Sequence, residues 1–227
     1  MNVDLAYLIG VYLSDGSAHQ SYGNWIVSLT VKDEDFAEEF AGVLSRISGQ
    51  PVGWYTDGDM WKVSYYSKEM VLYLWDVTNH KAKIPESIAL NDIPIKLSFL
   101  AGFLDGDGYI TKHKSKDQYQ IGFVGVDDWV KDTLPGFLLG LGMKPGKVNT
   151  SWPKTQFKAN RPIHRVLVNV HSFVAAGGFA RMKRKNDRIL EYYELHQSEF
   201  TDAEKQRRYK RIKSILPSET TGFYGNA

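Results

Sequence analysis

The sequence contains no cysteine among its 227 residues, which excludes disulfide bonds, thiolate zinc sites and cysteine nucleophiles. No apolar run is long enough to span a membrane, and the N-terminus lacks the basic and apolar pattern of a secretion signal. The six histidines show no metal-ligand spacing. Hydrophobic residues make up 43% of the chain, enough for a substantial core. We therefore expect a soluble, intracellular protein without a membrane anchor.

The formal net charge is only +2, but it is unevenly distributed. Residues 1–94 contain 6 Lys and Arg against 13 Asp and Glu, whereas residues 95–195 contain 16 against 9 and residues 196–227 contain 6 against 4. Charge asymmetry of this kind indicates a polyanionic partner. We expect the second half and the tail to make most contacts with the phosphates of such a partner.

A nine-residue stretch occurs twice in the chain. The first copy, LIGVYLSDG, begins at Leu8, and the second copy, LAGFLDGDG, begins at Leu100. The copies align without a gap, so that Gly10 corresponds to Gly102 and Asp15 to Asp107. Because an internal repeat dictates architecture, this spacing predicts two equivalent halves.

Each copy has the apolar spacing of a short buried helix, and the glycine that ends it can take the left-handed conformation of a helix C-terminus. Gly10 and Gly102 lie inside these helices, where glycine costs about 1 kcal/mol relative to alanine. Close backbone approach between the two helices would offset that cost. Asp15 and Asp107 would then lie together at two helix C-termini, a strongly negative position that favours a divalent cation suited to phosphodiester chemistry.

The segments after each copy repeat the same order of elements. Alternating apolar and polar residues predict strands, and apolar residues at helical spacing predict helices. In the first half we expect a strand over 24–32, a helix from Asp33 to Gly49, a hairpin over 54–67 and a helix over 71–77. In the second half we expect a hairpin over 109–124, one helix from Asp127 to near Gly142, strands over 147–158 and 161–170, and a helix opening at Ser172 or Phe173.

At the two copies the sequence resembles the LAGLIDADG homing endonucleases, specifically their single-chain, two-motif type. The second copy differs from the name-giving string at Phe103 and Gly106, with Leu104 as a mild third change, and the first copy has Leu13 in place of the first Asp. The resemblance covers roughly residues 4–195. It implies an α+β fold of two pseudo-symmetric αββαββα repeats, in which curved antiparallel sheets form a DNA-binding saddle and the motif helices lie at the interface. We accordingly expect an N-terminal half at 1–94, a C-terminal half at 95–195 and a charged tail at 196–227.

The resemblance also implies a function: a site-specific double-stranded DNA endonuclease that acts as a monomer on a long target, leaves 3′ overhangs and serves intron homing or a free-standing gene. No protein partner is expected, and a chain that begins at Met1 is expected to lack a flanking intein domain. Asp15 and Asp107, with the backbone carbonyls of Ser14 and Gly106, would hold two or more Mg²⁺ ions. Mn²⁺ would substitute, and Ca²⁺ would support binding without cleavage.

A basic residue near each metal site often assists cleavage in this family. Lys32, at the end of a strand, matches one such position. The equivalent place in the second half is near Val126, which cannot serve, so Lys112 or Lys114 is expected to substitute and the two strands to be cut at unequal rates. A plain surface role is the alternative for Lys32.

A DNA-reading sheet needs amides, hydroxyls and cations on its outward face, since Asn and Gln pair with adenine edges and Arg pairs with guanine. The expected DNA-binding residues are Asn24, Ser28, Thr30, Lys62, Ser64, Thr111, Lys112, His113, Lys114, Gln118, Gln120, Lys147, Lys154, Lys158, Arg165 and Asn169. An ordinary solvated sheet face is the alternative for each of them.

Other interpretations of the motif are weaker. An EF-hand starting at Asp105 needs an acidic or amide side chain where Tyr109 stands and Glu where Lys116 stands, so it is excluded. A DNA-binding regulator or an RNA splicing factor (maturase) with the same fold would not need both carboxylates, and this chain has both. An unrelated α+β enzyme would leave the basic second half and the polar sheet faces unexplained.

Overall fold

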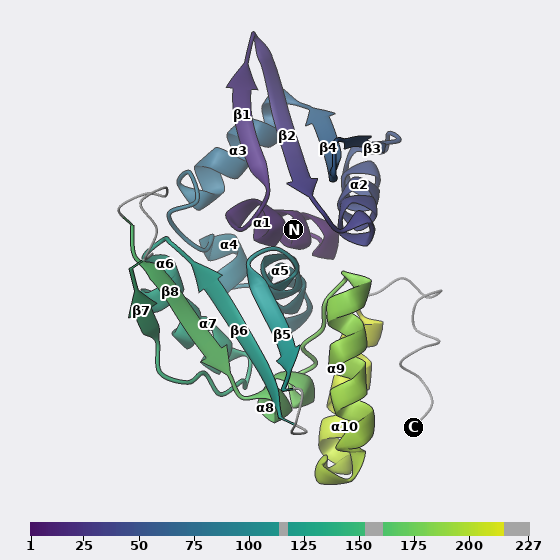
Figure 1. Ribbon diagram of the computed structural model, residues 1–227, viewed down its shortest axis with the longest axis vertical. Coiled ribbons are helices and arrows are strands. Elements are labelled where there is room, and N and C mark those ends of the chain that lie inside the picture. The colour runs from purple at the N-terminus through teal and green to yellow at the C-terminus, as the bar shows by residue number, and fades with distance from the viewer. Residues whose placement is uncertain (114–117, 153–160, 216–227) are drawn as a thin grey trace. The chain divides into compact units, whose positions relative to one another are not determined.

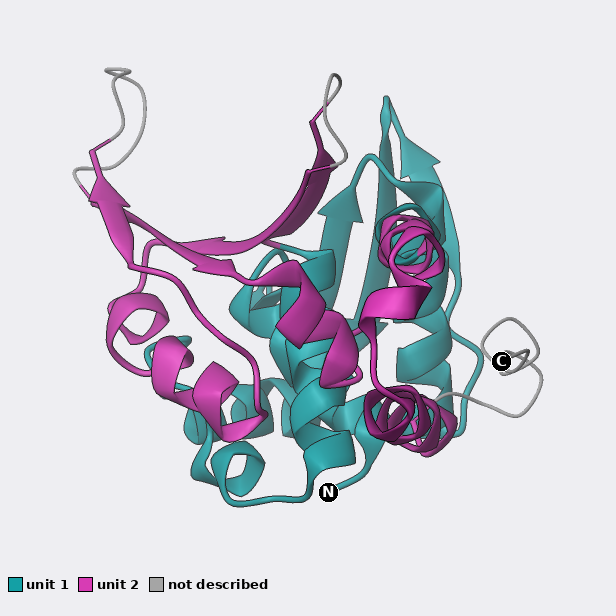
Figure 2. Cartoon of the chain, turned by 90° about the horizontal axis from the view of Figure 1, so that it is seen from below, with its two compact units in different colours: residues 1–106, 180–186 teal, residues 107–179, 187–227 magenta. Residues whose placement is uncertain are grey.

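The computed structural model describes residues 1–113, 118–152 and 161–215. The chain forms two compact units, one comprising residues 1–106 with 180–186 and the other residues 107–179 with 187–227 (Figure 2). Each unit contains one four-stranded antiparallel sheet. The two-repeat α+β fold that the sequence predicted is confirmed, although the first unit includes a short segment from late in the chain.

The first unit is a sheet backed by helices (Figure 1). Its strand order is β1-β2-β4-β3, and α2 and α3 pack against it. Phe36 and Phe40 on α2 and Leu74 on α3 are buried in the core of this unit. The hairpin between β1 and β2 turns at Tyr22 and Gly23, whose φ values of 48° and 81° suit a tight two-residue turn. The elements are α1 (Val3–Leu13), β1 (Ser17–Ser21), β2 (Asn24–Val31), α2 (Glu34–Ser48), β3 (Trp54–Asp57), β4 (Met60–Tyr66), α3 (Lys68–Thr78), α4 (Glu86–Ala89) and α5 (Ile93–Asp105).

The motif helices α1 and α5 both belong to the first unit and pack tightly against each other. A Cβ atom on Gly10 would lie 2.1 Å from the carbonyl oxygen of Phe99, and one on Gly102 would lie 2.2 Å from that of Tyr7. Only glycine permits backbones to approach this closely. The predicted role of the two motif glycines is therefore confirmed.

The second unit repeats the sheet with the order β5-β6-β8-β7. Helices α6 and α8 pack on it, and α10 packs against α8 by donating hydrogen bonds from Arg208 and Arg211 to the carbonyls of Val174, Gly178 and Ala176 at the end of α8. The elements are β5 (Gly108–Lys112), β6 (Tyr119–Gly125), α6 (Trp129–Asp132), α7 (Leu134–Gly140), β7 (Asn149–Ser151), β8 (Ile163–Val168), α8 (Val170–Ala175), α9 (Lys183–Leu195), a 3-10 turn η1 (Gln197–Glu199) and α10 (Asp202–Lys213).

Three local predictions differ from the structure. The helix expected from Asp127 to Gly142 is two helices that meet at Thr133, because Pro135 lacks an N–H and its ring disfavours a continuous helix. Gly16 and Gly108 do not have the left-handed conformation; Gly108 instead begins β5. β8 ends at Val168, so Asn169 is not a strand residue: its side chain accepts a hydrogen bond from the N–H of Ser172 and caps α8, which begins at Val170.

Candidate metal centre and nucleic-acid interface

The C-terminal ends of α1 and α5 meet within the first unit. A Cβ atom on Gly106 would lie 2.0 Å from the Oγ atom of Ser14 and 3.2 Å from the backbone nitrogen of Asp15. Ser14 is itself fixed, because its hydroxyl donates to the carbonyls of Gly10 and Val11. Gly106 thus lies against the residue that precedes Asp15 and is bonded directly to Asp107, the carboxylate of the second motif.

Two lysines that the sequence interpretation did not single out lie on these helix ends. The Nζ atom of Lys81 donates to the carbonyls of Ser14 at 3.1 Å and Gly16 at 2.7 Å. The Nζ atom of Lys185 donates to the carbonyls of Leu104 at 2.7 Å, Asp105 at 2.6 Å and Gly106 at 3.2 Å. Each ammonium group therefore offsets the negative end of one motif helix.

The charges of this cluster depend on one another. Burial raises the pKa of the Asp15 carboxyl above its ordinary value, and the ammonium groups of Lys185 and Lys81 oppose the rise. Burial lowers the pKa of Lys185, and the carboxylates of Asp105 and Asp15 oppose that change. The lysines therefore help to keep Asp15 ionised, the state in which a carboxylate binds a metal ion.

The donor atoms at the motif ends suit a hard divalent cation. Carboxylate and carbonyl oxygens are the ligands that Mg²⁺, Mn²⁺ and Ca²⁺ take in proteins. Within the described ranges no three His, Asp or Glu side chains gather as a complete metal-binding group. An ion held by the predicted ligand Asp15 would thus need further oxygens from backbone, water or a phosphate, and the carbonyls of Ser14 and Gly106 already accept from lysines.

Lys32 does not take part in this cluster of contacts. Its side chain is 74% exposed, and its Nζ atom lies 3.5 Å from a carboxylate oxygen of Asp59. The ammonium groups that act on Asp15 are those of Lys185 and Lys81 instead. The catalytic role of Lys32 stays a prediction, with a less favourable position than the two lysines on the helix ends.

The outward face of the first sheet gathers most of the polar residues expected there. Ser28 pairs with Ser64 and Thr30 with Lys62 across β2 and β4, so these side chains share a face, opposite the buried Leu29. The same face includes Asn24 at the start of β2 by strand alternation. The ammonium group of Lys62 forms an ion pair with Asp57, so part of its charge is compensated.

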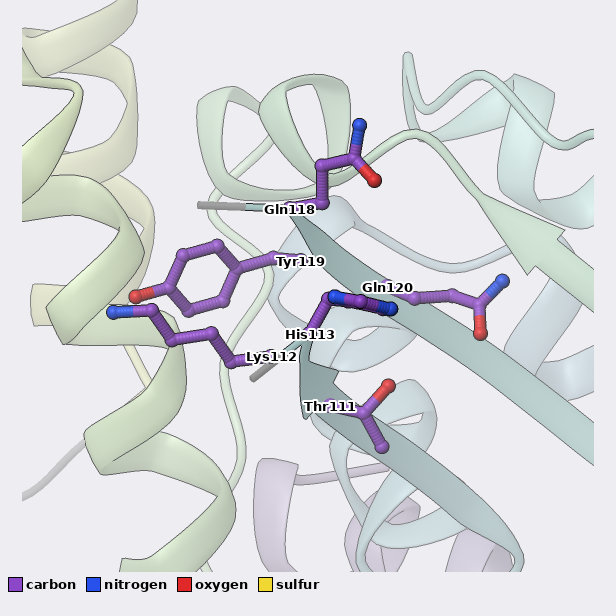
Figure 3. A pocket seen from close by; sticks show the side chains of 6 residues that line it. All are labelled: Thr111, Lys112, His113, Gln118, Tyr119 and Gln120. Atoms are coloured by element: carbon purple, nitrogen blue, oxygen red, sulfur yellow. The ribbon is translucent and has the colours of Figure 1, made fainter. Parts of the chain in front are cut away.

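The second sheet separates the expected residues by strand alternation. Thr111 pairs with Gln120 on the outward face, whereas Lys112 pairs with Tyr119 on the opposite face (Figure 3). The Nζ atom of Lys112 lies 2.9 Å from a carboxylate oxygen of Glu191 on α9 and 5.2 Å from the centre of the Tyr119 ring. Because neighbouring strand residues point to opposite faces, Lys112 does not share the face of Thr111 and Gln120. Its ammonium group contacts α9, so its role at a nucleic acid stays a prediction with a less favourable position.

A hollow of about 650 Å³ lies at this end of β5 and β6, lined by Thr111, Lys112, His113, Gln118, Tyr119 and Gln120.

Arg165 pairs with Val124 on the outward face, where its guanidinium lies 5.9 Å from the ring of Tyr109. Lys147 is exposed just before β7. Asn169 is exposed, but its side chain caps α8. Lys114, Lys154 and Lys158 lie outside the described residues.

Comparison with known proteins agrees with the motifs and with the fold. A family model described as a LAGLIDADG-like domain matches residues 2–52. The structure of I-DmoI in complex with DNA and Mn is similar to this chain with a TM-score of 0.55 and 15% identity, covering 77% of this chain and 97% of that one. The meganuclease I-SmaMI bound to uncleavable DNA is similar with a TM-score of 0.51 and 12% identity, covering 95% and 99%.

Two uncharacterized proteins of Methanocaldococcus jannaschii are related in sequence. MJ0314 is 29% identical over 148 residues, which make up 62% of this chain and 55% of that protein. MJ0398 is 28% identical over 117 residues, or 49% and 41%. The chain thus spans about half the length of the curated relatives it matches. Among the described residues no helix is both long and apolar enough to cross a membrane. Taken together, the two motif copies, the family model that matches residues 2–52 and the shared two-repeat fold make this chain similar to the LAGLIDADG proteins.

Proposed function

We propose that this chain is a site-specific, metal-dependent double-stranded DNA endonuclease that acts as a monomer and leaves 3′ overhangs. The observation that carries the proposal is the packing of Gly106 against Ser14, which joins the two motif ends at the residues next to Asp15 and Asp107. Structures of the similar protein I-DmoI contain DNA with Mn or with Ca, which supports the same partner and metals for this chain.

In this proposal Asp15 and Asp107 would be the carboxylate ligands of divalent ions. When bound, such ions neutralise phosphate charge, lower the pKa of an attacking water and stabilise the leaving 3′ oxygen. Before DNA binds, Lys81 and Lys185 reduce the electrostatic repulsion at the motif ends, because the ammonium group of each donates to carbonyl oxygens there. The outward sheet residues, Arg165 and Gln120 among them, would read base edges in the major groove.

In vitro selection from a randomised duplex library tests the function. We expect one long sequence to be enriched by binding in Ca²⁺ and to be cut in both strands only in Mg²⁺ or Mn²⁺, with cutting abolished by EDTA. Enrichment without cutting would favour a DNA-binding regulator. No enrichment would turn attention to RNA and a splicing role.

Substitution of the motif carboxylates completes this test. Asp107→Asn and Asp15→Asn should abolish cutting and leave binding in Ca²⁺ within about threefold, because the amide keeps the shape but loses the charge that holds the ion. Asp76→Asn, on the exposed side of α3, is the matched control and should cut like the wild type. Full cutting by Asp107→Asn would contradict the assignment.

A further inference from the structure

Asp105, the last residue of α5, holds a segment from much later in the chain. The residue is 2% exposed, and its Oδ2 atom accepts three hydrogen bonds. The donors are the hydroxyl of Tyr7 at 2.8 Å and the backbone N–H groups of Arg181 at 2.9 Å and Met182 at 3.1 Å. The first motif copy has Leu13 at the equivalent position, which can accept none of these bonds.

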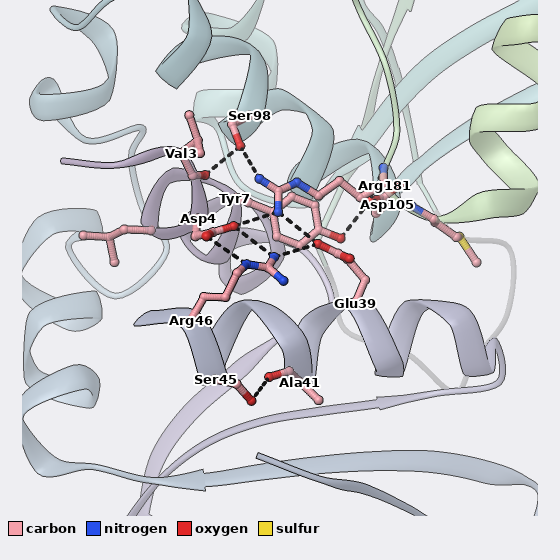
Figure 4. Close-up of polar contacts among 12 residues, drawn as sticks. Val3, Asp4, Tyr7, Glu39, Ala41, Ser45, Arg46, Ser98, Asp105 and Arg181 are labelled. Atoms are coloured by element: carbon pink, nitrogen blue, oxygen red, sulfur yellow. Dashed lines mark hydrogen bonds and ion pairs between the residues drawn. The ribbon is translucent and has the colours of Figure 1, made fainter. Parts of the chain in front are cut away.

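The anchored segment, residues 180–186, is fixed in the first unit by a second set of contacts (Figure 4). The Arg181 side chain is 4% exposed, and its guanidinium donates to Asp4 at 2.8 Å, Glu39 at 2.9 Å and the hydroxyl of Ser98 at 3.1 Å. These charge-assisted hydrogen bonds from the two terminal nitrogens of Arg181 hold the segment that carries it against α1, α2 and α5. The hydrogen bonds from the backbone N–H groups of Arg181 and Met182 to Asp105 then fix the residues directly before α9, which begins at Lys183.

Lys185 follows three residues after Met182 and lies on the end of α5. It is 9% exposed, and its three bonds go to the consecutive carbonyls of Leu104, Asp105 and Gly106. Asp107 is the next residue in the chain. The position of this ammonium group therefore depends on a segment whose backbone N–H groups, at Arg181 and Met182, donate to the side chain of Asp105.

Lys81 reaches the end of α1 in another way. Asn79, His80 and Lys81 all have positive φ, at 48°, 53° and 73°. Three consecutive non-glycine residues in the left-handed region carry backbone strain, and this left-handed run turns Lys81 back to the carbonyls of Ser14 and Gly16. At the end of α1, Lys81 thus reaches the carbonyls without a carboxylate that holds its segment. This agrees with the presence of Leu13 in the first motif copy at the position equivalent to Asp105.

We propose that Asp105 is a positioning residue for the second motif end: it holds residues 180–186 so that Lys185 lies on the carbonyls next to Asp107. The consequence rests on the proposed function. Loss of the anchor disturbs the end of α5 and leaves Lys81 on α1 in place, so one strand of the target is cut more slowly than the other.

Two substitutions of Asp105 separate the anchor from its charge. Asp105→Asn keeps an oxygen that can accept from Tyr7 and from the backbone N–H groups of Arg181 and Met182. Asp105→Leu removes every acceptor and places in the second motif copy the leucine that the first copy has at position 13. Hydrogen exchange of the full-length chain reports the anchor without any activity. We expect exchange at Arg181 and Met182 to be about tenfold faster in Asp105→Leu and near wild type in Asp105→Asn, since one lost buried hydrogen bond is worth about that factor.

Cleavage of a supercoiled plasmid carrying the selected target then reports the consequence. Asp105→Leu should accumulate nicked circles in Mg²⁺, with the second cut slowed by about tenfold or more, while Asp105→Asn cuts both strands like the wild type. Lys185→Met should also accumulate nicked circles, but with wild-type exchange at Arg181 and Met182. This variant keeps the test decisive if Asp105→Leu does not fold.

Unchanged exchange in Asp105→Leu, or equal slowing of both strands in a folded Lys185→Met protein, would overturn the proposal. If the wild-type chain cuts no selected duplex, the proposed function fails, whereas the exchange experiment still decides whether Asp105 anchors residues 180–186.

Discussion

At the scale of single residues, the motif glycines and the two helix-end lysines differ in how far the sequence reveals them. Gly10 and Gly102 recur at equal places in a repeat, and glycine inside an apolar helix has few explanations besides close packing. Lys81 and Lys185 carry no local signal. Their positions depend on a left-handed run at 79–81 and on a segment held by Asp105, and both are consequences of tertiary contacts.

Gly102→Ala should destabilise the protein by about 2–4 kcal/mol, because the new Cβ would meet the Tyr7 carbonyl at 2.2 Å and both helix backbones would have to move. Gly136→Ala is the matched control inside α7, where nothing lies within 4 Å of the new atom. It should stabilise the protein by about 0.5–1 kcal/mol. Urea unfolding followed by circular dichroism measures both. A Gly102→Ala variant as stable as the wild type would refute the tight contact.

At the scale of elements, the alternating and helical patterns predicted β2, the β3–β4 hairpin and the helices α2 and α3 well, but no expected element covered β1 or α4. Such patterns arise because buried positions of a helix or strand recur at a fixed spacing, so the apolar residues that fill them recur at the same spacing in the sequence. They predicted less well where local chemistry overrides periodicity, as at Pro135, which divides one expected helix, and at Asn169, which caps α8. Alternation itself places Lys112 on the inner face, but only the structure reveals that α9 lies there.

The contact of α9 with the second sheet should depend on pH through Glu191. Hydrogen bonding to Lys112, aided by Tyr119 and Arg188, lowers the pKa of Glu191 to about 2. A lowered carboxyl pKa stabilises the fold above the ordinary pKa of 4.5, and this contribution is lost as the pH falls from 4.5 towards 2. Because the Glu191 side chain is 35% exposed, solvent screening reduces the contribution to about 0.5–1 kcal/mol.

Glu191→Gln should therefore lower the free energy of unfolding at pH 7 and converge with the wild type near pH 2–3. Glu194→Gln, on the same helix and exposed, is the matched control for the loss of one carboxylate from α9. Chemical unfolding at a series of pH values measures the difference. A gap between Glu191→Gln and wild type that persists unchanged at low pH would argue against the ion pair with Lys112.

At the scale of the whole molecule, the acidic first half is partly compensated by the chain's own later residues. Residues 180–186 contain four cations and no acid, and they belong to the first unit. That unit consequently has 11 Lys and Arg against 14 Asp and Glu. Arg181 pairs with Asp4 and Glu39, and Arg184 pairs with Asp33 at 3.2 Å. A count along the sequence cannot anticipate this, because the segment joins a unit that its position in the chain does not indicate.

The remaining charge difference predicts how DNA affinity responds to salt. Each phosphate contact made by a cation adds about 0.9 to the slope of log affinity against log salt concentration. If exposed cations of the second unit make these contacts, Lys147→Met should reduce the slope by about 0.9 and weaken binding to specific and unrelated duplexes alike. Lys83→Met, an exposed lysine in the loop after α3, is the matched control and should leave the slope unchanged. Fluorescence anisotropy with the selected duplex in Ca²⁺, over a range of KCl concentrations, measures both variants.

Equal slopes for Lys147→Met and wild type would remove Lys147 from the nucleic-acid interface. A loss of slope in Lys83→Met would extend the interface to the first unit, because each slope counts only charges that displace counterions from the DNA.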